Sequence, residues 1–214
     1  MNQENNIEND EWSKEIVLNG CQLKLEPLSL MHLDDLEQNL LDPHSWNSKH
    51  WGFYKRNDLR TLIERSFEMR QSCKENAFAM VMTSTREAVG ISRLMAFKKR
   101  DHVLEIGGTW IAQHWQKTFV NTEAKLLMLT YAFEKLCCQR VEFRVDALNF
   151  NSQRAVLRLG AKYEGELRNI YRLPNGRQRD YKIYSILATE WLNLKSILNW
   201  YLEKYVSAEK HSNK

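Results

Sequence analysis

Hydrophobic residues change their spacing twice along the middle of the chain, and this order constrains the fold more than any other feature. Three short segments, 78–83, 88–97 and 103–111, alternate or run apolar as β-strands do. After Trp115 the apolar residues recur at helical spacing, at Ala124, Leu127, Met128, Tyr131 and Ala132. From Val141 to Ala147 they alternate again with charged residues. The pattern predicts a three-stranded antiparallel meander, a long helix and a further strand.

The flanking segments extend this α/β arrangement. They contain turn residues and apolar periods typical of short elements. We expect a strand at 21–25, helices at 30–40 and after Asn57, a short helix from Asn151, a hairpin around Pro174, Asn175 and Gly176, and a last helix at 190–206. The aromatic stripe of that last helix suits core packing or an oligomer contact.

The composition fits one globular domain. The chain has 214 residues, of which 43% are hydrophobic and 27% charged, and it contains no internal repeat or linker rich in Pro, Gly or Ser. We expect a single domain over residues 11–206, with a flexible polar leader at 1–10 and a flexible tail at 207–214.

Several classes of protein are disfavoured by the same sequence. No apolar run approaches the roughly 20 residues that cross a bilayer, and the polar start lacks a secretion signal. The four cysteines lack the spacing of a metal site or a disulfide framework, so we expect free thiols and no metal. A net charge of +4, well mixed along the chain, does not indicate nucleic-acid binding. The cluster Arg177-Gln178-Arg179 is interpreted as solvated loop charge. We expect a cytoplasmic protein.

The order of elements and several short motifs resemble one enzyme superfamily. The motifs are Leu104-Glu105-Ile106-Gly107, the stretch from Gln116 to Ala124, Asn149-Phe150-Asn151-Ser152, Leu159-Gly160-Ala161, Glu164 to Arg168, Asn175-Gly176 and Asp180-Tyr181. Together they resemble the GCN5-related N-acetyltransferase (GNAT) superfamily, most closely its ribosomal-protein N-terminal acetyltransferase branch. The resemblance implies a mixed, mostly antiparallel, splayed sheet flanked by helices on both faces.

The resemblance also implies acetyl-coenzyme A (acetyl-CoA) as cosubstrate. The N-terminus of a helix can hold the pyrophosphate of this cosubstrate, and the turn after Trp115 leads into such a helix. The residues of this turn implied to bind the cofactor are Gln116, Lys117, Thr118, Phe119, Val120, Asn121 and Thr122. The family's two glycine positions hold Phe119 and Asn121, and a side chain at Phe119 could crowd the phosphates unless its φ is negative. An ordinary strand-to-helix turn is the alternative.

Three further features complete the implied cofactor site. Backbone groups of Trp110 and Ile111 would pair with the pantetheine arm, and Arg154 would lie near the phosphates or on a solvated helix surface. Gly107 and Gly108 predict either a β-bulge that opens the strands or a weak point in the strand.

Acetyl transfer requires a neutral amine and a proton for the leaving thiolate. By resemblance, Glu105 takes the proton of the amine, unless it only positions the acceptor or pairs with a base. Asn149 and Ser152 match the family's N-x-x-S, in which both side chains approach the cofactor and Ser152 is the acid, and both residue types also cap helices. The tyrosine that other branches use as acid is absent near Val156.

The acceptor would contact an aromatic and basic wall. Trp46, Trp51, Arg168 and Tyr171 are its candidate residues, although packing also explains the aromatic ones. We expect a primary amine to attack acetyl-CoA directly in a ternary complex. We expect the protein to be a monomer or a homodimer. A non-catalytic acyl-CoA-binding regulatory module and a basic adaptor for RNA or ribosomes are the alternatives, and the sequence does not identify the amine.

Overall fold

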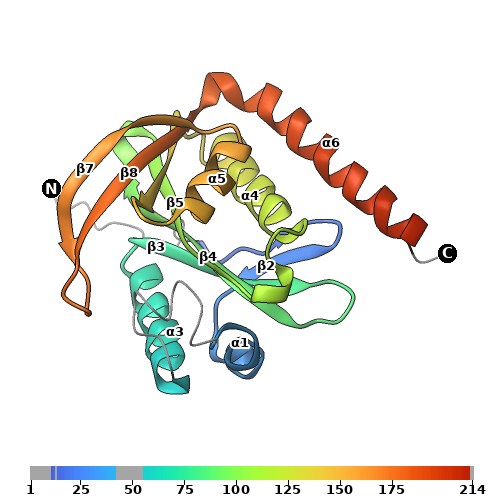
Figure 1. Ribbon diagram of the computed structural model, residues 1–214, viewed down its shortest axis with the longest axis horizontal. Helices are drawn as coiled ribbons and strands as arrows, with labels where there is room; N and C mark the ends of the chain where they lie inside the picture. Colours follow the sequence, from blue (N-terminus) through green and yellow to red (C-terminus); the bar gives the residue numbers. More distant parts are fainter. Residues whose placement is uncertain (1–10, 13, 42–54, 213–214) are drawn as a thin grey trace, which may run out of the picture.

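The computed structural model describes residues 11–12, 14–41 and 55–212 (Figure 1). Its elements follow the predicted order. They are β1 (Leu18–Asn19), β2 (Leu23–Pro27), α1 (Leu33–Leu40), α3 (Arg56–Gln71), β3 (Glu75–Met82), β4 (Ala88–Lys98), β5 (Val103–Ile111), α4 (Val120–Thr130), β6 (Arg140–Asp146), α5 (Phe150–Arg158), β7 (Lys162–Arg172), β8 (Gln178–Leu187) and α6 (Ala188–Ser212). A π-helical turn, Tyr131–Lys135, extends α4.

The strands form one sheet, and its topology leaves a single parallel contact. Across the described residues the order is β1-β2-β3-β4-β5-β6-β8-β7. Neighbouring strands are antiparallel except β5 and β6, which run parallel. The helix α4 connects these two parallel strands, as a parallel crossover requires. The predicted mixed, mostly antiparallel sheet is confirmed.

Helices cover both faces of the sheet (Figure 1). Leu104 and Ile106 of β5 lie in a core cluster with residues of α4, α5 and α6. A second cluster joins residues of β3, such as Ala79, to Leu36 of α1 and Leu59 of α3. Because successive side chains of a strand point to opposite faces, Glu105 lies on the α1 and α3 side of β5.

The local sequence patterns predicted most element boundaries to within a few residues. The strand predicted at 103–111 is β5, with the same bounds. The last helix extends to Ser212, beyond the predicted end at residue 206. All four cysteines are free thiols, as expected. Within the part of the chain that is described, no helix combines the length and apolar character needed to cross a membrane.

Candidate active site

The strands β5 and β6 part just beyond Glu105, which is the last residue of β5 with a partner in β6, opposite Glu142. In the next residues of β5 the register against β4 shifts, and Gly108 adopts φ +55°. A Cβ on Gly108 would collide with the guanidinium of Arg93, so glycine suits this position in two respects. The predicted β-bulge is therefore confirmed, and it lies beside the opening between the strands.

A buried lysine that sequence reasoning missed lies behind this bulge. Lys125 of α4 is 4% exposed, and its Nζ lies 2.7 Å from Ser92 Oγ and 2.6 Å from Thr109 Oγ1. Burial lowers the pKa of Lys125 to about 7. The available signal was a lysine between Ala124 and Leu126 on a helix whose neighbouring residues are apolar.

Glu105 is the most perturbed acid at the opening. Glu105 is only 8% exposed, and its Oε2 lies 3.3 Å from Arg144 Nε. Burial raises the pKa of Glu105 to about 7, although the positive charge of Arg144 opposes the rise. A carboxyl group with this pKa can accept a proton near neutral pH, which is the property of a general base.

A second acid anchors the neighbouring strand. Asp146, at the end of β6, is 1% exposed, and its Oδ2 lies 2.5 Å from Arg177 Nη2 and 3.0 Å from Arg179 Nε. The guanidinium of Arg179 also lies 4.5 Å from the ring centre of Tyr181. Arg179 is buried, so the interpretation of this basic cluster as solvated loop charge was wrong for that residue. The sequence could not show that an acid distant in the chain lies beside it.

The helix α5 begins directly after β6 and is capped by a predicted site residue. Asn149 Oδ1 accepts a hydrogen bond from the backbone N–H of Ser152 at 3.1 Å, so the expected capping role is confirmed. Among the described residues, the hydroxyl of Ser152 has no hydrogen-bond partner. Val156, near the position where other branches of the superfamily have a tyrosine, is buried. Ser152 thus carries an unengaged hydroxyl beside the end of β6.

The predicted cofactor residues form one continuous region. Trp110 and Ile111 end β5, and the segment from Gln116 to Thr122 forms the following turn and the first residues of α4. The side chain of Gln116 donates to the carbonyl oxygen of Ile111 at 3.1 Å. The hydroxyl of Thr118 accepts a hydrogen bond from the backbone N–H of Val120 at 3.3 Å. These bonds fix the turn that leads into the helix.

Phe119 occupies the first glycine position of the family pattern without requiring a glycine conformation. Its φ is −66° and its side chain is 3% exposed. The ring packs against Trp115 and against Tyr205 of α6, at centroid distances of 6.1 and 5.3 Å. In this turn the positive φ, +64°, belongs to Lys117. The ring of Phe119 is therefore part of the core at the base of the turn.

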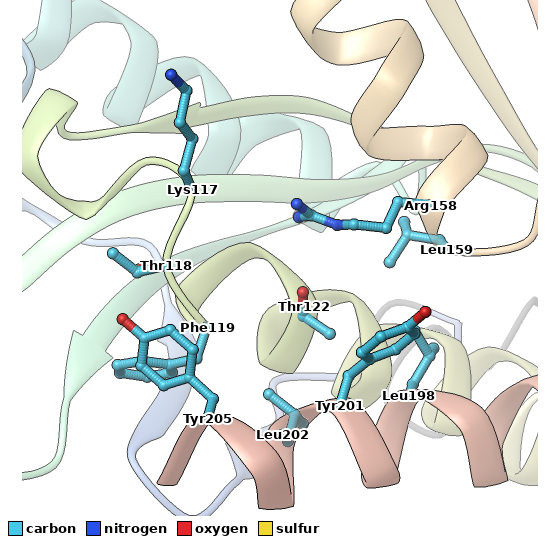
Figure 2. Close-up of a pocket in the computed structure, with 10 residues that line it drawn as sticks. All are labelled: Lys117, Thr118, Phe119, Thr122, Arg158, Leu159, Leu198, Tyr201, Leu202 and Tyr205. Atoms are coloured by element: carbon cyan, nitrogen blue, oxygen red, sulfur yellow. The ribbon is translucent and has the colours of Figure 1, made fainter. Parts of the chain in front are cut away.

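A pocket of about 160 Å³ opens beside this turn (Figure 2). Thr118 and Thr122 line it from the start of α4, together with Arg158 at the end of α5 and several residues of α6. Arg158 and the α6 residues were not predicted as site residues. The position of Arg158 near the end of the N-x-x-S helix was a signal that could have suggested it.

The remaining predicted site residues do not line this pocket. Arg154 is exposed, donates to Asn151 Oδ1 at 2.6 Å, and is not among the residues that line the pocket. Arg168 and Tyr171 are exposed on β7. Trp46 and Trp51 lie outside the described residues.

Comparisons with known proteins agree with this geometry. The profile of the family described as acetyltransferase (GNAT) domain matches residues 22–162. An N-acetyltransferase from Bacillus licheniformis named p20, itself uncharacterized, is 27% identical over 79% of this chain and 95% of that protein. The crystal structure of a GCN5-related N-acetyltransferase from Brucella melitensis has a TM-score of 0.80 at 25% identity, covering 88% of this chain and 86% of that one.

A more distant structure shares the fold. It is RimL, a ribosomal L7/L12 alpha-N-protein acetyltransferase solved in complex with coenzyme A. Its TM-score is 0.68 at 17% identity, over 80% of this chain and 98% of that one. The predicted resemblance to the GNAT superfamily is confirmed, and ribosomal-protein acetyltransferases are among the matches.

Proposed function

Because the chain belongs to the GNAT acetyltransferase family and is an acetyl-transferring enzyme, we propose that it acetylates a primary amine with acetyl-CoA. The acceptor is a protein N-terminus or a small-molecule amine, and it attacks the thioester directly in a ternary complex. The observation that carries this proposal is a buried carboxyl group, Glu105, at the opening between β5 and β6.

The described residues fit acetyl-CoA. The edge of β5 beyond Glu105 has no partner in β6, which leaves strand backbone available to an extended chain such as pantetheine. Trp110 and Ile111 lie on this part of the strand. The ring of Phe119 is packed in the core, which supports phosphate binding at the turn. When bound, acetyl-CoA supplies an acetyl group activated as a thioester.

Glu105 acts as general base in this proposal. An amine must lose a proton before its nitrogen lone pair can form a bond to the acetyl carbon. Glu105 takes this proton directly or through a water molecule, and Arg144, 3.3 Å from its Oε2, holds the carboxylate in place. The pKa of about 7 keeps a large fraction of Glu105 ionised at neutral pH while leaving it basic enough to accept the proton.

Ser152 and Asn149 serve the leaving group. The hydroxyl of Ser152 has no partner among the described residues, so it is available to donate a proton to the thiolate. Asn149 fixes the first turn of α5 by accepting from the backbone of Ser152, and it orients that residue. Because Val156 stands near the position where other branches have a tyrosine, Ser152 is the proposed acid for the thiolate.

Free-thiol release from acetyl-CoA tests the proposal. The purified protein is incubated with a pooled panel of amines and N-terminal peptides, beside a calorimetric titration of acetyl-CoA. We expect release above the rate without acceptor, and its loss in Glu105→Gln. Binding without release by any pool would favour the acyl-CoA-binding regulatory module, and no binding at all would refute the proposal. The cytoplasmic location predicted from the sequence is part of the same proposal and is tested by cell fractionation.

A further inference from the structure

Asp146 is a buried acid that has no role in the proposed reaction. It is the last residue of β6 and is 1% exposed. Burying a carboxylate is costly unless its oxygens are paired and hydrogen-bonded, so its partners indicate what the charge stabilises. These partners come from two separate segments, the turn before α5 and the start of β8.

Each carboxylate oxygen binds one of these segments. Oδ1 of Asp146 accepts a hydrogen bond from the backbone N–H of Leu148 at 2.9 Å. Oδ2 lies 2.5 Å from Nη2 of Arg177, directly before β8, and 3.0 Å from Nε of Arg179, near the start of that strand. We call these four residues the Asp146 junction. The junction joins the hairpin of β7 and β8, which forms one edge of the described sheet (Figure 1), to the turn between β6 and α5.

The turn on one side of the junction carries the residues proposed to serve the leaving group. The backbone N–H of Asn149 donates to the carbonyl oxygen of Asp146 at 2.8 Å, and the side chain of Asn149 caps α5 at Ser152. The side chain of Gln153 donates to the carbonyl oxygens of Asp146 and Ala147 at 3.2 and 2.8 Å. The position of Ser152 therefore depends on hydrogen bonds that converge on Asp146.

The other side of the junction lies beside the proposed base. Burial raises the pKa of Glu105, and nearby positive charges oppose the rise, first that of Arg144 and also that of Arg179. The charged and titratable groups that act on Glu105 are Arg93 of β4, Glu142 and Arg144 of β6, and Arg179 and Tyr181 of β8. Because Asp146 offsets part of the charge of Arg179, it also determines how strongly that charge favours the ionised form of Glu105.

We propose that Asp146 is a positioning residue for the transfer reaction. Through Oδ1 it holds the turn that places the hydroxyl of Ser152, and through Oδ2 it holds Arg179 beside Glu105. It acts through these residues and not on the reacting atoms. The junction is a set of contacts within the fold, whereas its effect on catalysis rests on the proposed function, in which Glu105 is the base and Ser152 the acid.

Three variants change the charge of the junction. The parent junction has a net charge of +1, from −1 at Asp146 and +1 at each of Arg177 and Arg179. Asp146→Asn keeps an oxygen that can accept from the N–H of Leu148 but raises the net charge to +2. Arg177→Gln lowers it to 0, and the double variant returns it to +1.

The pKa of Glu105 reports this charge without requiring turnover. It is measured by ¹³C NMR titration of the side-chain carboxyl groups, and comparison with Glu105→Gln identifies the signal. We expect the pKa of Glu105 to fall from about 7 in Asp146→Asn, because a more positive junction favours the carboxylate, and to rise in Arg177→Gln. The double variant should return it toward the parent value.

The rate of acetyl transfer reports the position of Ser152. Asp146→Asn and the double variant should both lower kcat by roughly 10- to 100-fold, because the turn loses its charged anchor on β8 and a catalytic group is misplaced. The KM for acetyl-CoA should stay within about twofold of the parent value, because kcat alone changes when only a transition-state interaction is lost. The double variant thus separates the charge of the junction from its positioning effect.

Glu134→Gln is the control. Glu134 also accepts from two side chains, those of Trp191 and Lys195 at 2.8 and 2.6 Å, but it joins the π-helical turn after α4 to α6. This variant should change neither kcat nor the pKa of Glu105. Circular dichroism and urea unfolding show whether each variant is folded.

The outcomes separate this inference from the proposed function. An unchanged kcat and an unchanged pKa of Glu105 in folded Asp146→Asn would overturn the inference. So would a lower kcat with no pKa change in any variant, because a purely structural role predicts that result. If Asp146→Asn does not fold, Arg177→Gln provides the test, and an unchanged pKa there overturns the inference. If the pKa moves as expected but acetyl-CoA supports no thiol release, the coupling of the junction to Glu105 stands and the proposed function fails.

Discussion

Replacing Glu105 with Gln is expected to abolish most activity and, at the same time, to stabilise the fold at high pH. Burial raises the pKa of Glu105 from 4.5 to about 7, which means that the folded protein resists ionisation of this side chain. At 1.36 kcal/mol per pH unit, the rise corresponds to roughly 3 kcal/mol of destabilisation once the group is ionised in both states. A neutral amide of similar shape avoids this cost.

The sign of the effect follows from proton binding. Between about pH 4.5 and 7 the unfolded chain has lost the Glu105 proton and the folded chain retains it, so the stability of the parent protein falls as pH rises. The stability difference in favour of Glu105→Gln should therefore be small at pH 4, grow through this window and level off above pH 7. General-base loss should reduce kcat by about 10²- to 10⁴-fold.

Urea unfolding at pH values from 4 to 8 measures this difference. Glu166→Gln is the control, because Glu166 is exposed on β7 and has no ion-pair partner among the described residues. A difference that stays constant across this pH range would refute the reasoning. A Glu105→Gln protein that is less stable than the parent at pH 8 would show that the ion pair with Arg144 outweighs desolvation.

Three further predictions concern Ser152, Phe119 and Lys125. Ser152→Ala should lower kcat by roughly 10²-fold without changing the calorimetric affinity for coenzyme A, and a change in affinity alone would contradict its role as acid. Phe119→Gly, which restores the family's glycine, should destabilise the fold by about 3–5 kcal/mol because the ring packs against Trp115 and Tyr205; urea unfolding measures this, and a loss below about 1 kcal/mol would argue against that packing. Burial lowers the pKa of Lys125 from 10.5 to about 7, so stability should rise with pH across this range as only the unfolded chain remains protonated. In Lys125→Met the free energy of unfolding, measured with urea at pH 7 and 10, should not show this rise. An equal change in the free energy of unfolding of the two proteins between these pH values would contradict the prediction.

Local patterns were sufficient to predict the elements and part of the site. The bounds of β5 followed from its run of β-type residues, whereas Glu105 became a candidate base through the family resemblance. Two adjacent glycines in β5 indicated either a bulge or a weak point in the strand, and the structure has the bulge, with Gly108 at φ +55°. These features depend on residues close in sequence, whose side-chain directions are set by the geometry of a strand. Motif resemblance then led to the family.

The sequence by itself therefore determined the order of strands and helices, the family and the candidate base. Only the tertiary structure decided how distant elements meet. Phe119 lies in the core, where Tyr205 from the distant helix α6 packs on its ring. Lys125 is buried against hydroxyl groups of β4 and β5, and Arg158 shares a pocket with α6. Periodicity gives the face on which a side chain lies, but its neighbours, its burial and hence its pKa depend on packing between elements far apart in the chain.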